Sequence, residues 1–185
     1  ARRCVEETGT TLNGKLAIKD QSEWSLSQDA AYVHYADNET IGGLQFAGVP
    51  EVNAPLVSDL SSSILSAPID VSKFGLIYAG AQKNIGPAGL TIVIVRDDLL
   101  DQSRSEIPSI LKYSAQAKND SMVNTPATYS WYLSGLVFEW LLEQGGVEAI
   151  HQVNLEKAKL LYGYIDASDF YNNPIACLLY TSPSP

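Results

Sequence analysis

Cysteine, methionine and basic residues are scarce in this chain of 185 residues. It holds 2 cysteines and 1 methionine, and 12 Lys and Arg stand against 21 Asp and Glu, a formal net charge of −9. Cys4 and Cys177 have no Cys/His cluster around them, which argues against a zinc site or a disulfide framework and favours a reducing cytoplasm. The acidic balance argues against binding nucleic acid through a broad basic surface. No apolar run approaches the roughly 20 residues of a membrane-spanning helix, and the start lacks the apolar core of a signal peptide. We therefore expect neither a nucleic-acid nor a membrane partner.

Apolar residues make up 45% of the chain, enough for a domain with a buried core. Short apolar runs bounded by turn residues predict strands at residues 30–35, 55–57, 74–79 and 90–95. The fourth run is β-branched without alternation, so we expect burial on both of its faces. The segment Gly86-Pro87-Ala88-Gly89 predicts a hairpin-like or tight connection between the last two strands.

Beyond residue 124 the apolar period changes from that of strands to that of a helix. Thr125 is the expected N-cap, Pro126 the first helical residue, and Gly145-Gly146 the stop. A second helix is expected at residues 147–165. Strands mixed with helices predict an α/β domain whose ligands bind at the loops after the strands.

Three strand-end loops each present a different polar group. Thr40 follows the first strand, Asp59 the second, and Gln82-Lys83 the third. A lysine and a carboxylate on neighbouring strand ends suit pyridoxal phosphate, which needs an amine for its aldehyde and an anion for its ring nitrogen. A phosphate-binding P-loop is the alternative, but its Gly-Lys-Ser/Thr pattern is absent from this segment.

Three motifs carry a specific resemblance to a known family. They are Asn38-Glu39-Thr40, Asp59-Leu60-Ser61-Ser62, and the long segment Tyr78-Ala-Gly-Ala-Gln-Lys-Asn-Ile-Gly-Pro-Ala-Gly-Leu-Thr-Ile-Val-Ile-Val95. With Val123-Asn124-Thr125-Pro126 they resemble the phosphoserine aminotransferases, class-V, fold-type-I pyridoxal-phosphate enzymes. The resemblance is dense at residues 31–142 and thinner to residue 171. It implies a fragment of the large cofactor-binding domain, with a mixed, mostly parallel sheet flanked by helices.

The resemblance implies a role for each matching residue. Lys83 would form the covalent imine with the cofactor and act as general base and acid, and Asp59 would pair with the pyridinium nitrogen. Thr40 would bind on the side of the phenolic oxygen, and Gln82 would contribute to the phosphate site. Asn124 and Thr125 would reach the cofactor phosphate of a neighbouring subunit, so a homodimer would share the active site.

The family reaction transfers an amino group between glutamate and 3-phosphohydroxypyruvate in serine biosynthesis. Some bacterial members also serve vitamin B6 synthesis. Two alternatives remain open: another class-V pyridoxal-phosphate enzyme, and an inactive truncated fragment of the aminotransferase. No metal site is expected.

The ends of the chain and several aromatic residues carry further expectations. Residues 1–174 are expected to be a partial large domain with the start of the connection to a small domain, and residues 175–185 a non-native tail. His34 is expected to be a hydrogen-bonded core histidine, and His151 to be solvated on the polar side of its helix. Trp131, Tyr132 and Trp140 are expected to serve packing and a dimer surface.

Overall fold

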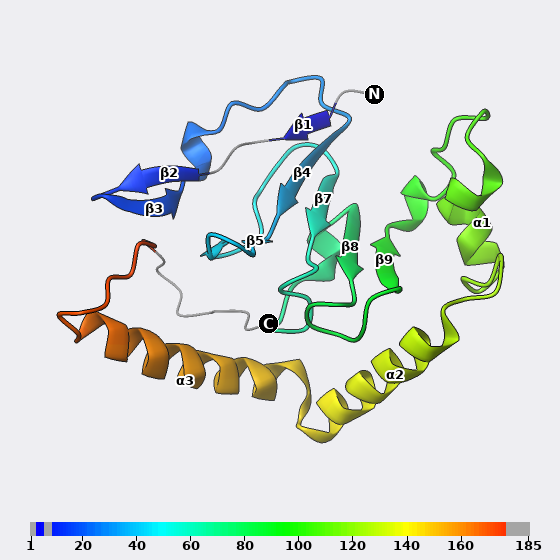
Figure 1. Ribbon diagram of the computed structural model, residues 1–185. Helices are drawn as coiled ribbons and strands as arrows, with labels where there is room; N and C mark the ends of the chain where they lie inside the picture. Colours follow the sequence, from blue (N-terminus) through cyan, green and yellow to red (C-terminus); the bar gives the residue numbers. More distant parts are fainter. Residues whose placement is uncertain (1–2, 6–8, 177–185) are drawn as a thin grey trace.

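A five-stranded mixed sheet forms the centre of the computed structural model, which describes residues 3–5 and 9–176 (Figure 1). The order is β1-β4-β7-β8-β9. Four strands run parallel, and the fifth pairs antiparallel with β8. Their bounds are β1 (Arg3–Val5), β4 (Tyr32–Ala36), β7 (Leu56–Asp59), β8 (Leu76–Gly80) and β9 (Thr91–Val95). The expected α/β class with a mostly parallel sheet is confirmed, as is the hairpin-like connection before β9.

Smaller elements surround this sheet, and the sequence patterns did not reveal them. Two-stranded ribbons join β2 (Gly9–Leu12) to β3 (Lys15–Ile18) and β5 (Asn38–Glu39) to β6 (Leu44–Gln45). Single 3₁₀ turns are η1 (Gln21–Glu23), η2 (Val71–Lys73), η3 (Asp97–Leu99) and η4 (Ser109–Leu111), and α1 spans Tyr113–Lys118. Ile175 bridges to Leu16 of β3, while Cys177 and residues 178–185 lie outside the described residues.

Side-chain alternation in the parallel strands places the core on one face of the sheet. Val33 and Tyr35 of β4, Leu56 of β7, and Ile77 and Ala79 of β8 are all buried. The residues between them, on the opposite face, are only partly buried or exposed. The sheet therefore has one fully packed face and one more open face within the described part of the chain.

The expectation that the fourth strand is buried on both faces is wrong. Val93 and Ile94 of β9 remain 38% and 40% exposed. The strand lies at the edge of the sheet in the described residues, so it pairs on one side alone. Its β-branched run reflects strand propensity, which does not distinguish a central strand from an edge strand.

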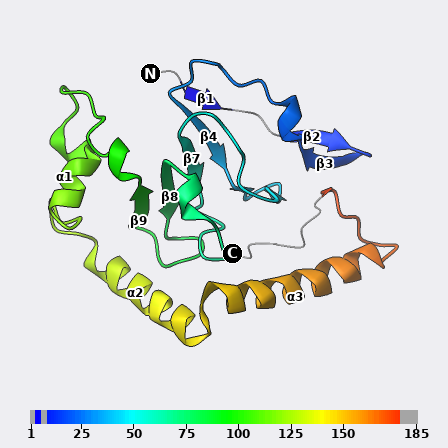
Figure 2. The ribbon, with the colours of Figure 1, turned by 180° about the vertical axis from the view of Figure 1, so that it is seen from behind.

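Two long helices, α2 (Thr128–Glu143) and α3 (Gly146–Asp166), follow one another along one side of the sheet (Figures 1 and 2). Both helices and the break at Gly145 are as expected, but the predicted cap is wrong. The N-cap is Ala127, with no side-chain capping bond. The first ladder bond runs from Trp131 N to Ala127 O, so Thr125 and Pro126 precede the helix.

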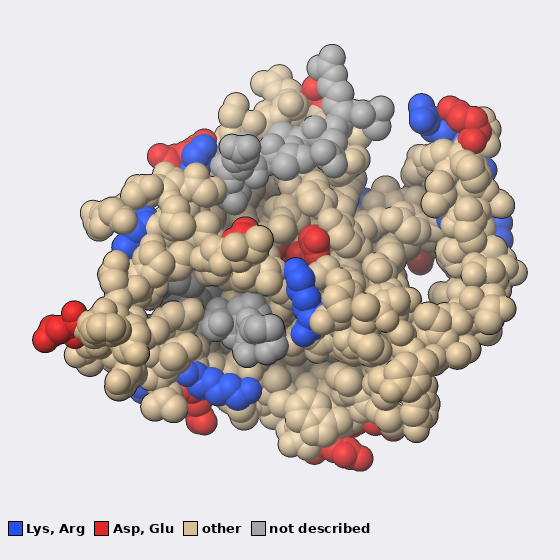
Figure 3. All heavy atoms as spheres, in the orientation of Figure 1, with Lys and Arg blue, Asp and Glu red and all other residues tan. Residues whose placement is uncertain are grey.

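The charged side chains on one face of the molecule are dispersed. On the face seen in Figure 3, Lys and Arg atoms form isolated spots rather than a continuous surface. Among the described residues, no helix combines the length and apolar character needed to cross a membrane.

Candidate active site at the carboxyl edge of the sheet

Backbone register brings the predicted site to one edge of the sheet. Ala36 of β4 pairs with Asp59 of β7, which pairs with Tyr78 of β8. Because these strands are parallel, the loops that follow them leave from the same edge. Thr40, Asp59 and Lys83 therefore share one end of the sheet, although they are far apart in sequence.

The clearest contact of the site joins two of these loops. Lys83 Nζ donates a hydrogen bond of 2.7 Å to Thr40 Oγ1, and both side chains are exposed. The amine therefore projects from the edge of the sheet rather than into the core, where a ligand can reach it.

The loop that carries Lys83 is anchored on both sides of the lysine. Ala81 and Ile85 are buried, and Ile85 N and Gly86 N both donate to Ala81 O, at 3.1 and 2.9 Å. Asn84 Nδ2 donates to the carbonyl of Ile64 at 2.5 Å. These contacts fix a tight turn, so the lysine backbone is held while its side chain stays outside.

The three side chains of the motif Asn38-Glu39-Thr40 make different contacts. Asn38 is buried and its Nδ2 donates to Ser62 Oγ at 2.9 Å. The Glu39 carboxylate accepts from the backbone N–H groups of Ile41 and Gly42 and so closes the turn around Thr40. Asn38 and Glu39 thus set the loop, and the Thr40 hydroxyl is presented to Lys83.

Asp59 uses one carboxylate oxygen to hold its own turn. Oδ1 accepts from Ser61 N at 2.8 Å and from Ser61 Oγ at 2.5 Å, and Ser61 Oγ in turn accepts from Gly80 N at 3.0 Å. No hydrogen bond to a described residue involves Oδ2. The capping role and the predicted role on a cofactor nitrogen are therefore compatible, because each uses a different oxygen.

Gln82 is exposed and folds back over the end of β8. A Cβ built on Gly80 would lie 2.8 Å from both Gln82 Nε2 and Oε1, so the amide occupies the space above that glycine. Gln82 thus lies beside Lys83 on the edge, without a hydrogen bond to another described residue.

Asn124 and Thr125 are not brought to Lys83 in this chain. Both are exposed in the segment before α2, and Asn124 Nδ2 donates to Thr125 O at 3.1 Å. Asn124 lines a cavity of about 560 Å³ over β9, together with Tyr113 of α1 and Trp131 of α2. Thr40, Asp59, Gln82 and Lys83 form one group, and these two residues form another.

Another cavity lies away from both groups. Its volume is about 590 Å³, and it is enclosed by the β2–β3 ribbon, residues 44–50 and the chain after α3. None of the predicted site residues lines it, so volume alone does not locate the chemistry here. The described residues contain no group of three or more His, Cys, Asp or Glu side chains that could hold a metal ion.

The two histidines differ from each other in environment. His34 is part-buried, and its Nε2 lies 2.9 Å from the Tyr78 hydroxyl, so the expected hydrogen-bonded histidine is confirmed. The expectation of a solvated His151 is wrong in part, because its Nδ1 is buried and has no hydrogen-bond partner among the described residues. The other side chain that sequence reasoning passed over is Asp37, where burial raises the pKa of the carboxyl.

Fold and site together define an α/β domain that presents a lysine, a carboxylate and a hydroxyl at the carboxyl edge of a mostly parallel sheet. The family model for aminotransferase class-V matches residues 4–177, and the chain belongs to that family.

Individual relatives agree with this assignment. Phosphoserine aminotransferase of Acinetobacter baylyi is 89% identical over 172 residues, which cover 93% of this chain and 48% of that protein. The pyridoxal-phosphate-bound phosphoserine aminotransferase of Trichomonas vaginalis has a TM-score of 0.86 and 40% identity, covering 94% of this chain and 51% of its own. That of Bacillus circulans has a TM-score of 0.78 and 45% identity, covering 82% and 42%. The chain spans about half the length of the curated relatives it matches.

Proposed function

We propose that this chain is part of a phosphoserine:2-oxoglutarate aminotransferase, which moves an amino group reversibly between glutamate and 3-phosphohydroxypyruvate in serine biosynthesis. The observation that carries the proposal is the hydrogen bond between Lys83 and Thr40 at the same edge of the sheet as Asp59, whose Oδ2 is not used by its turn. The 89% identity to the Acinetobacter baylyi enzyme supports the substrate class.

The residues at the edge of the sheet fit pyridoxal phosphate. Lys83 offers an exposed amine, and Asp59 has an oxygen not used by its turn. The Thr40 hydroxyl, 2.7 Å from that amine, would bind the phenolic oxygen, and Gln82 would contribute at the phosphate. When bound, the cofactor supplies an aldehyde for amine exchange and a ring that accepts electrons.

This chain's own residues would then hold and move protons. Asp59 Oδ2 would accept the N–H of the ring nitrogen, while Ser61 keeps Oδ1 fixed. Once an incoming substrate amine has released Lys83, its Nζ would take a proton from the substrate α-carbon as general base and, as general acid, deliver it to the carbon that was the aldehyde carbon of the cofactor. Thr40 would keep Nζ near its starting position between these steps.

We further propose that residues 1–174 are part of a large cofactor-binding domain and that two copies share each active site. Asn124 and Thr125 are exposed and separate from Lys83, which suits residues that serve the phosphate of a neighbouring subunit. Trp131, Tyr132 and Trp140 of α2 are 37%, 64% and 51% exposed and would be covered in such a dimer. A chain with 2 cysteines fits a cytoplasmic location.

The test uses a chimera: the Acinetobacter baylyi enzyme in which the 172 matching residues are replaced by those of this chain. We expect it to bind pyridoxal phosphate with the visible absorbance of a protein imine and to transaminate phosphoserine with 2-oxoglutarate. Lys83→Ala should abolish the imine absorbance and lower kcat by at least about 100-fold.

Lys73→Ala is the matched control, because Lys73 is an exposed lysine on η2, before β8. It should behave like the parent chimera. If Lys83→Ala kept both the imine absorbance and the transaminase activity, the proposed function would be wrong.

A further inference from the structure

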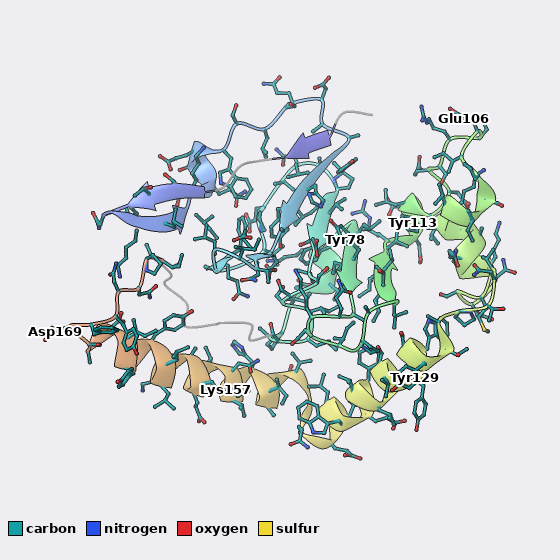
Figure 4. The ribbon with its side chains drawn as sticks, in the orientation of Figure 1. Tyr78, Glu106, Tyr113, Tyr129, Lys157 and Asp169 are labelled. Carbon is teal, nitrogen blue, oxygen red and sulfur yellow. The ribbon has the colours of Figure 1, made fainter. Side chains whose placement is uncertain are left out.

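A histidine and a tyrosine form a bonded pair across the open face of the sheet. His34 on β4 and Tyr78 on β8 are separated by β7, yet His34 Nε2 lies 2.9 Å from the Tyr78 hydroxyl. Their rings stack with centroids 5.9 Å apart and planes 18° from parallel. Figure 4 labels Tyr78, which lies on β8, between β7 and β9 in the sheet.

The register places this pair on the same face as Asp59. His34 pairs with Val57, and Tyr78 pairs with Asp59. Paired residues of parallel strands share a face, and so do residues two apart on one strand. His34, Asp59 and Tyr78 therefore lie on one face, opposite the buried Leu56 and Ile77.

The Tyr78 ring must cross β7 on the face of the sheet that carries Asp59. Neighbouring strands are about 4.8 Å apart, so Tyr78 can meet His34 two strands away only by crossing β7. Tyr78 starts level with Asp59, and His34 lies level with Val57. The ring thus crosses β7 between these two rows, on the face of the sheet that carries Asp59.

We propose that His34 and Tyr78 are a positioning pair for Asp59, holding its open oxygen toward the ring nitrogen of the cofactor. Ser61 restrains Oδ1 from the loop side, and the Tyr78 ring restrains the side chain from the sheet side. His34 fixes that ring by its bond to the hydroxyl. This inference rests on the proposed function, because it concerns the same carboxylate.

Three substitutions in the chimera separate positioning from packing. Tyr78→Phe keeps the ring and removes the hydroxyl, and His34→Ala removes the partner. His34→Gln keeps a side chain that can bond the hydroxyl. Tyr32→Phe is the control, because it removes a hydroxyl on the same strand face two residues before His34.

Two readouts are measured: the dissociation constant of pyridoxal phosphate, and the ¹⁵N NMR shift of cofactor labelled at the ring nitrogen. Loss of one such bond should weaken binding by about 3- to 10-fold. In Tyr78→Phe and His34→Ala the ¹⁵N signal should also move toward that of an unprotonated ring. His34→Gln should recover part of both changes, and Tyr32→Phe should match the parent.

The outcomes distinguish this inference from the proposed function. If the parent chimera showed no imine absorbance, the proposed function would fail and the positioning role with it. If the parent bound cofactor through Lys83 but Tyr78→Phe and His34→Ala left affinity and the ¹⁵N shift unchanged, the positioning role alone would be overturned. A weaker affinity with an unchanged ¹⁵N shift would mean that the pair serves only packing.

Discussion

Gly86 lies where the loop of Lys83 meets helix α2, and it leaves no room for a side chain. A Cβ at this position would stand 2.2 Å from Ser134 Oγ, 3.3 Å from its Cβ and 3.4 Å from its Cα. Ser134 is 1% exposed, so its hydroxyl has little space into which it could rotate. We therefore predict that Gly86→Ala destabilises the protein by about 1–3 kcal/mol through overpacking.

The second half of this prediction concerns rescue. Ser134 Oγ is buried with no hydrogen-bond partner among the described residues, so Ser134→Ala alone should change stability by less than about 1 kcal/mol. In the double variant the 2.2 Å contact is gone and the 3.3 Å contact to Cβ remains. It should regain more than half of the loss, a coupling energy of about 1 kcal/mol or more.

Urea unfolding of the cofactor-free chimera measures these differences. Gly135→Ala is the control, because a Cβ there meets nothing within 4 Å, and alanine should stabilise α2 by about 0.5–1 kcal/mol. Gly86 N also closes the turn around Lys83, so Gly86→Ala should weaken cofactor binding as well. A stability within about 0.5 kcal/mol of the parent, or no rescue by Ser134→Ala, would refute the steric reasoning.

Three further changes test other parts of the structure. Burial raises the folded pKa of Asp37 above its ordinary 3.8, so its contribution to stability falls as the pH rises from about 3.8 through the folded pKa. Asp37→Asn should thus gain stability over the parent as the pH rises above about 3.8 through the folded pKa, and a constant difference in urea midpoints would contradict this. Ala127→Ser should stabilise α2 by about 1 kcal/mol by supplying the missing cap, which an unchanged midpoint would disprove. Asn38→Ala should cost about 1–3 kcal/mol through the lost bond to Ser62, and Ser62→Ala in that background should add little; full additivity would count against the bond.

The meeting of the strand-end loops could be predicted because it depends on the order of the strands rather than on side-chain detail. Once residues 30–35, 55–57 and 74–79 are identified as parallel strands, their following loops must meet at one edge. Thr40 and Lys83 are 43 residues apart and yet form a 2.7 Å hydrogen bond. No side-chain geometry was needed to expect this meeting, because the order of strands and loops sufficed.

The errors arise where a local pattern has two structural outcomes. The run at residues 90–95 has the composition of a buried central strand, but its exposure depends on what lies beside it in the sheet. Thr125-Pro126 fits a helix start, yet helix α2 begins two residues later because the first ladder bond forms at Ala127. Residue types alone therefore do not determine whether a strand lies at the edge of its sheet, or at which residue a helix begins.

The family motifs are several residues long because, at each strand end, some residues fix the loop backbone and others present the functional group. In the first loop Asn38 and Glu39 hold the backbone, and Thr40 presents the hydroxyl. In the second, Asp59 does both, since one oxygen binds Ser61 and the other stays open. A reactive group by itself would need one residue, whereas placing it at a fixed angle to its neighbours needs the residues that close each turn. Motifs of this kind are therefore as long as the turns they stabilise. Substitution of a residue that closes a turn, such as Asn38 or Glu39, should weaken cofactor binding without removing any group that would touch the cofactor.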